Sequence, residues 1–210
     1  AGIPVVTFNT DSETSKRIAF YGQDTVESGR VQAKFLAEYM GGKGKVLITS
    51  CDAAAPWSQN REKGVREKMA EYPDIEVIGI LNAKGDEQTT YAAIENAIVA
   101  NPDLAGIASL DAVTTPAVGR AIIRYNLIGK VKQVGHDLMP ETLDNIKAGA
   151  TNASLSQNPF MQGYQPVKAL FEFLTKDVPL ESLDTGILKV DETNVDEFLK
   201  RLEEGDPTVG

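Results

Sequence analysis

The chain has 210 residues, of which 42% are hydrophobic and 24% are charged, and its formal net charge is −9. This length and composition are typical of a globular protein that buries a core without disulfides. The acidic excess repels phosphate backbones and anionic lipid surfaces, so nucleic-acid binding by this domain is disfavoured. A single cysteine, Cys51, and a single histidine, His136, exclude an internal disulfide and any metal site rich in cysteine or histidine.

Short β-branched segments alternate with amphipathic segments of helical length along the whole chain. Two of the strand segments, 46–48 and 77–81, are apolar at nearly every position, which is typical of a parallel sheet covered on both faces. The pattern predicts an α/β fold with a doubly wound parallel sheet. Expected strands are 3–8, 17–21, 45–49, 76–81, 106–109, 132–135, 153–156 and 187–190, and expected helices are 26–40, 59–71, 87–100, 116–125, 141–148, 161–175 and 195–204.

Local signals support several of these boundaries. Gly41 and Gly42 follow the first helix, where glycine tolerates the left-handed conformation that ends a helix. Thr115 before Pro116 predicts an N-cap followed by a proline in the first turn. Thr193 and the acidic side chain three residues later resemble a capping box at the start of the last helix.

Hydrogen-bonding side chains follow six of the expected strands at the point where each strand ends. Open parallel sheets bind ligands outside the carboxyl ends of their strands, so these side chains are candidate ligand contacts. Carboxylates, amides and arginine suit a ligand rich in hydroxyl groups. At any single position, helix capping or turn formation is the alternative explanation. The residues that follow the strands include Asn9, Thr10, Asn82, Asp111, His136, Asp137, Gln157 and Asn158, and Trp57, Asn60 and Arg61 lie in one further loop.

Seven segments in order carry a family resemblance: GIPVVTFNTDS (2–12), RIAFYGQDTVESGR (17–30), GGKGKVLI (41–48), NREKG (60–64), NPDLAGIASLD (101–111), KVKQVGHDLMPETLDNIKAG (130–149) and SLSQNPFMQGYQPVKALFEFL (154–174). In combination they resemble the periplasmic sugar-binding proteins of the ribose/galactose type. That family shares its fold with the effector domains of lactose-repressor-like regulators. The resemblance covers essentially the whole chain.

The resemblance implies a set of sugar contacts. Asp111 and Asp137 would accept hydrogen bonds from hydroxyl groups, Arg61 would donate to ligand oxygens, and Gln157 would bridge two lobes. The family usually has an acidic residue where Asn9 stands, and its ribose binders have arginine at the next position, so ribose is disfavoured. The full expected set is Asn9, Thr10, Trp57 as a stacking surface, Arg61, Asp111, Asp137 and Gln157, with Asn60 and His136 as further contacts, although His136 is expected rather to pack inside the protein.

Proteins of this family have two lobes that close around the ligand, and the resemblance implies that one lobe is incomplete here. Residues 1–16 would be the last strand and crossover of an incomplete N-terminal lobe, and 17–157 would be the C-terminal lobe. Residues 158–185 would be a helix that belongs to the N-terminal lobe, and 186–210 would return to the C-terminal lobe and end in a tail. Since the chain opens at Ala1 without an initiator methionine, we expect a truncated or processed chain. Since part of one lobe would be missing, we expect the sugar affinity of this chain to be weak or undetectable, and weaker than micromolar. The exposed elements would then repack or pair with another copy as a homo-oligomer.

The resemblance implies non-catalytic binding of a small sugar or polyol, as the solute-binding component of an ABC transporter. Its partners would be the membrane subunits, and its location periplasmic or extracellular, lipid-anchored or soluble. The alternative is the effector domain of a cytoplasmic regulator or of a membrane sensor. An enzyme is disfavoured, because no dinucleotide, phosphate-loop or nucleophile-elbow motif is present, and no cofactor or metal is implied.

Overall fold

The computed structural model describes residues 2–84 and 86–210, so residue 1, where the first expected unit begins, lies outside it. Within these residues the strands form a six-stranded sheet of order β4-β3-β5-β6-β7-β9 and a three-stranded sheet of order β1-β2-β8. The strands are β1 (Val6–Phe8), β2 (Ala19–Gly22), β3 (Lys43–Ser50), β4 (Asp74–Asn82), β5 (Leu104–Ser109), β6 (Lys132–His136), β7 (Ala153–Ser156), β8 (Leu183–Asp184) and β9 (Leu188–Asp191). The helices are α1 (Thr25–Met40), α2 (Pro56–Met69), α3 (Glu87–Ala100), α4 (Thr114–Arg124), α5 (Pro140–Lys147), α6 (Pro159–Lys176) and α7 (Val195–Glu203).

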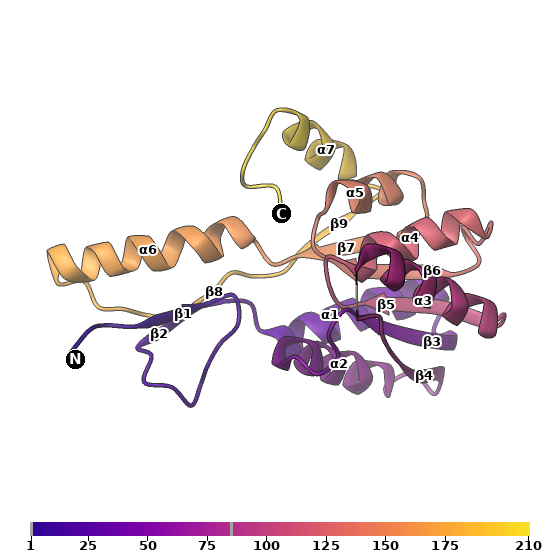
Figure 1. The fold of residues 1–210 in the computed structure, drawn as a ribbon, viewed down its shortest axis with the longest axis horizontal. Helices are drawn as coiled ribbons and strands as arrows, with labels where there is room; N and C mark the ends of the chain where they lie inside the picture. Colours follow the sequence, from indigo (N-terminus) through magenta and orange to yellow (C-terminus); the bar gives the residue numbers. More distant parts are fainter. Residues whose placement is uncertain (1, 85) are drawn as a thin grey trace.

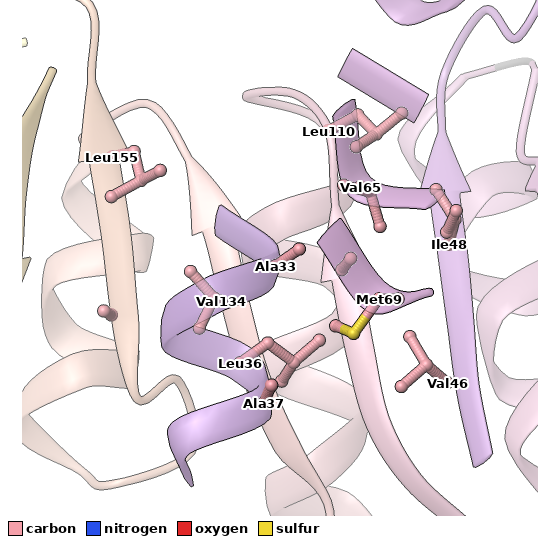
Figure 2. Packing of buried hydrophobic residues seen from close by; sticks show 12 residues of the cluster. Ala33, Leu36, Ala37, Val46, Ile48, Val65, Met69, Leu110, Val134 and Leu155 are labelled. Atoms are coloured by element: carbon pink, nitrogen blue, oxygen red, sulfur yellow. The ribbon is translucent and has the colours of Figure 1, made fainter. Parts of the chain in front are cut away.

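The large sheet carries the main core. Its strands are parallel except β9, which runs antiparallel to β7. One apolar cluster joins α1 and α2 to the sheet: it contains Leu36 of α1, Val65 of α2 and Ile48 of β3, and Val65 lies beside Ile48 (Figure 2). A second cluster, with Ile98 from α3 and Ile122 from α4, packs against the opposite side of the same strands. The expected doubly wound α/β sheet with helices on both faces is therefore confirmed.

The small sheet lies at the other end of the molecule, where α6 runs beside it (Figure 1). Its strands are parallel, and β2 pairs with both β1 and β8. The expected unit 17–157 is therefore wrong at its start, because β2 belongs to the small sheet. Strand β8 is not predicted from the sequence, because a strand of two residues has no detectable period.

Three short segments pass between the two halves of the molecule, and we call them the crossing segments: residues 23–24 between β2 and α1, 157–158 between β7 and α6, and 185–187 between β8 and β9. They are joined by hydrogen bonds across the gap between the sheets. The backbone N–H of Thr185 donates to the carbonyl of Gly22 over 3.0 Å, and Nε2 of Gln23 donates to the carbonyl of Gly186 over 3.0 Å. The candidate site lies at this junction.

Two expected helix caps are wrong. Helix α4 begins at Thr114, one residue before the expected cap, and the carboxylate of Asp111 accepts from its first N–H groups. Helix α7 begins after Asn194, and the hydroxyl of Thr193 instead donates to Asp191 over 2.6 Å. The expected end of α1 is confirmed, because Gly41 has a φ of 68°.

Helix α6 presents an apolar stripe on the side turned away from β1 and β2. Val167 is 68% exposed, and Tyr164, Phe171 and Leu174 are exposed on the same helix. Gln162 and Pro166 occupy the buried side. Among the residues that the structure describes, no helix combines the length and the apolar character needed to cross a membrane.

Candidate ligand-binding site

Arg61 is a buried charged residue, with 3% of its surface exposed. Its Nη1 donates to the carbonyl of Leu110 over 2.7 Å, and Nη2 makes a longer contact of 3.4 Å with Oε1 of Gln23. Its Nε has no hydrogen-bond partner among the described residues. Burial lowers the pKa of Arg61, and the charges of Asp137 and Asp111 oppose this shift. Since a guanidinium stays protonated, the site retains a buried cation with a donor to spare.

Two glycines explain how Arg61 reaches this depth. A Cβ on Gly29 of α1 would lie 2.1 Å from the carbonyl oxygen of Arg61, and one on Gly64 of α2 would lie 2.0 Å from the carbonyl oxygen of Val26. The two helices can therefore approach so closely only because both positions lack a side chain. This contact brings the first turns of α2, and with them Arg61, towards the carboxyl ends of the strands.

Asp137 and Gln157 are joined directly. Nε2 of Gln157 donates to Oδ1 of Asp137 over 2.7 Å, so the ends of β6 and β7 are linked. Asp137 has a φ of 68°, and its backbone is held by hydrogen bonds to Leu155 and from Ser154. Burial raises the pKa of the Asp137 carboxyl, and the nearby Arg61 cation opposes this. The half-buried carboxylate of Asp137 thus interacts electrostatically with the buried cation of Arg61.

Asp111 is used by the protein itself. Oδ1 accepts from the backbone N–H groups of Val113 and Thr114 over 2.9 and 2.8 Å. Oδ2 accepts from the N–H of Cys51 over 2.9 Å and from the hydroxyl of Thr114 over 3.1 Å. A carboxylate has about four acceptor positions, so these donors fill them. Asp111 therefore caps α4 and ties β5 to the loop after β3, and its expected role as a direct acceptor for a ligand stays a prediction.

His136 lies in the interior, with no exposed surface. Its Nε2 is 2.6 Å from the hydroxyl of Ser28, and its Nδ1 is 3.3 Å from the carbonyl of Ser109. Burial holds the pKa of His136 well below its usual value, with Arg61 adding to the effect. The neutral ring therefore donates from Nδ1 and accepts at Nε2. The expectation that it packs beneath Asp137 agrees with this position, and the alternative of a ligand contact does not.

The remaining candidates line an open pocket of about 790 Å³ between the small sheet and the starts of α1 and α2. Asn9, Thr10, Trp57 and Asn60 lie on its wall. Trp57 packs against the core with its ring 5.8 Å from the guanidinium carbon of Arg61. Arg61, Asp137 and Gln157 are not lining residues of this pocket, but two lining residues, Trp57 and Gln23, contact Arg61.

The candidate residues thus form two groups that lie close to each other. Asn9 and Thr10 come from the small sheet, and Arg61, Asp137 and Gln157 come from the large one. Gln23 and Gln162 are not predicted from the sequence as site residues. Both are 2% exposed, and their Oε1 atoms accept from Arg61 and from Asn9, respectively. No pattern in the sequence separates them from the other glutamines. Within residues 2–84 and 86–210, no group of three histidine, cysteine or acidic residues could hold a metal ion.

Comparisons with known proteins agree with this architecture. Residues 1–177 match the family described as periplasmic binding protein domain. The chain is 26% identical to the xylose/arabinose-binding protein XylF of Sulfolobus acidocaldarius over 95% of this chain and 53% of that protein. It is also 26% identical to the D-allose-binding periplasmic protein of Escherichia coli, over 78% of this chain and 53% of that protein.

A solved structure gives the same result. The sugar-binding protein of a sugar ABC transporter from Bacillus halodurans has a TM-score of 0.85 and 29% identity, covering 93% of this chain and 71% of that one. The chain spans about half the length of the curated relatives it matches. Since the family match extends over most of the sequence, the chain belongs to the periplasmic binding protein domain family.

Proposed function

We propose that this chain binds a small sugar or polyol without catalysis, as part of the solute-binding component of an ABC transporter. The observation that supports it most is the buried Arg61, whose Nε has no partner among the described residues and whose neighbour Trp57 lines an open pocket. A neutral polyhydroxylated ligand can accept from a cation and donate to a carboxylate at once. The names of the relatives, which bind xylose, arabinose and allose, point to the same class.

Each candidate residue has a distinct role in this proposal. Arg61 donates to ring or hydroxyl oxygens, and Asp137 accepts from a hydroxyl while Gln157 holds it in place. Trp57 covers an apolar C–H face of the ligand, since its ring already stacks near the guanidinium. Asn9, Thr10 and Asn60 supply further hydrogen bonds from the pocket wall. His136 acts only by supporting these side chains, and Asp111 holds the start of α4.

The biological setting follows from the same relatives and belongs to the proposal. The protein would work outside the cytoplasm, as the name of the D-allose-binding relative states for that protein. Transporter membrane subunits would be its partners. The apolar stripe of α6 would contact a further part of a two-lobe protein or another copy of the chain, because isolated proteins rarely expose a contiguous patch of this kind.

Nuclear magnetic resonance titration of the 210-residue chain tests the proposal, because it detects weak binding. D-xylose, D-arabinose and D-allose are added separately, and we expect at least one to shift the amide signals around Arg61, Asp137 and Trp57. Arg61→Gln should abolish these shifts. Arg66→Gln is the matched control, because Arg66 lies on the same helix but pairs with Glu62 at the surface. Equal shifts in both variants, or no shifts with any sugar, would reject the proposed function.

A further inference from the structure

Gln162 is a buried amide at the junction of the two sheets, in the first turns of α6. It is 2% exposed although it lies between the two groups of candidate residues. Its Oε1 accepts from Nδ2 of Asn9 over 3.0 Å. Its Nε2 donates to the carbonyl of Gln157 over 3.0 Å and to the hydroxyl of Thr185 over 3.1 Å. One side chain therefore bonds to the end of β1 and to two crossing segments.

Hydrogen bonds of the neighbouring residues extend these contacts into one connected network. The hydroxyl of Thr185 donates to the carbonyl of Gln157 over 2.8 Å, so that oxygen accepts from two side chains. The side chain of Gln157 in turn donates to Asp137. An unbroken series of hydrogen bonds thus runs from Asn9 through Gln162 and Gln157 to Asp137. It links a candidate residue of the small sheet to one of the large sheet.

The burial of Gln162 makes this network sensitive to its loss. A buried amide has two donors and an acceptor that water cannot replace, so each needs a protein partner. Two other side chains link crossing segments in the described part of the chain: Gln23, which contacts Arg61 and Gly186, and Thr185, which donates to the carbonyl of Gln157. The small sheet and α6 contribute few other polar contacts to the crossing segments. The relative position of the two groups therefore depends on a small number of amides.

We propose that Gln162 is a positioning residue, which holds Asn9 at the end of the small sheet and Gln157 and Asp137 at the end of the large sheet in one fixed geometry. It has no ligand contact of its own in this proposal. Without it, the crossing segments keep their backbone connections, but the two halves of the site are free to shift relative to each other. The sugar-affinity part of this inference rests on the proposed function, and the positional part does not.

The test replaces Gln162 with methionine, which has a similar shape but no amide. Spin labels are attached at Lys34→Cys on α1 and Lys168→Cys on α6, both exposed, in a Cys51→Ser background. Pulsed electron spin resonance then measures the distance between the labels without any sugar. We expect one narrow distance peak in the parent protein and loss of that peak in Gln162→Met. Gln165→Met, a partly exposed glutamine on the same helix, is the matched control and should keep the peak.

A sugar titration separates the role of Gln162 in positioning the two groups from its effect on sugar affinity. If a sugar binds the parent chain, Gln162→Met should weaken it about tenfold, as expected when buried hydrogen bonds to uncharged groups are lost. If no sugar binds the parent, the proposed function fails and the distance measurement still decides the inference. An unchanged distance peak in Gln162→Met overturns it. Should that variant not fold by circular dichroism, Thr185→Val removes the bond between Gln162 and Thr185 and the bond from Thr185 to the Gln157 carbonyl, and it is judged by the same peak.

Discussion

Replacing Asp111 with alanine should destabilise the fold much more than it affects any direct ligand contact. The change removes the acceptor for three backbone N–H groups and one hydroxyl. Loss of a helix cap costs about 0.5–2 kcal/mol. Leaving the N–H of Cys51 without its charged partner adds about 1–3 kcal/mol. We therefore expect a loss of about 3 kcal/mol, which in a protein of this size lowers Tm by roughly 6–12 °C.

Urea unfolding followed by circular dichroism measures this loss, because the midpoint moves while the slope stays constant. Asp111→Asn is the matched variant: one oxygen remains as an acceptor, so about half of the effect should remain. The sugar titration is repeated on both variants below their unfolding midpoints. A wild-type midpoint combined with complete loss of sugar-induced shifts would refute the capping role and return Asp111 to the ligand-contact set.

Three further predictions follow from single observations. Gly64→Ala places a Cβ 2.0 Å from the carbonyl oxygen of Val26, so it should lower the free energy of unfolding in urea by about 1–3 kcal/mol. A Cβ on Gly163 of α6 has no atom within 4 Å, so the control Gly163→Ala should not destabilise the fold. Equal urea midpoints for the two variants would contradict the close contact between α1 and α2. The pKa of His136 is lowered in the folded state, so the unfolded chain binds more protons below about pH 6.5. The free energy of unfolding should therefore fall as the pH drops below about 6.5, by at most about 1.4 kcal/mol per pH unit. His136→Gln should remove this contribution to the pH dependence of the free energy of unfolding. Burial raises the pKa of Cys51 to about 11, so its alkylation by iodoacetamide at pH 8 should be roughly a hundredfold slower than that of a thiol with the ordinary pKa of 9.0. An alkylation rate equal to that of a free peptide thiol would show that Cys51 is not buried as described.

The sequence by itself determined the order and type of most elements, because hydrophobic periodicity is a local property. The expected helix 87–100 and strand 153–156 agree with α3 and β7 at both ends. The family resemblance also came from the sequence, and the comparisons confirm it. The alternating pattern further placed polar residues at the carboxyl ends of parallel strands, which is why the candidate residues lie near one edge. None of this requires knowledge of contacts between distant residues.

The tertiary structure alone decided what each polar side chain does. Asp111 and Asp137 both follow strands in the sequence, yet the carboxylate of the first caps a helix and that of the second accepts from Gln157. The partners that separate them come from other elements, as with His136 and Ser28, which lie 108 residues apart in the chain. Gln162 depends on such partners too, since it bonds to Asn9 across 153 residues. A hydrogen bond of this kind exists only after the sheets have assembled, so no local pattern of residues can encode it.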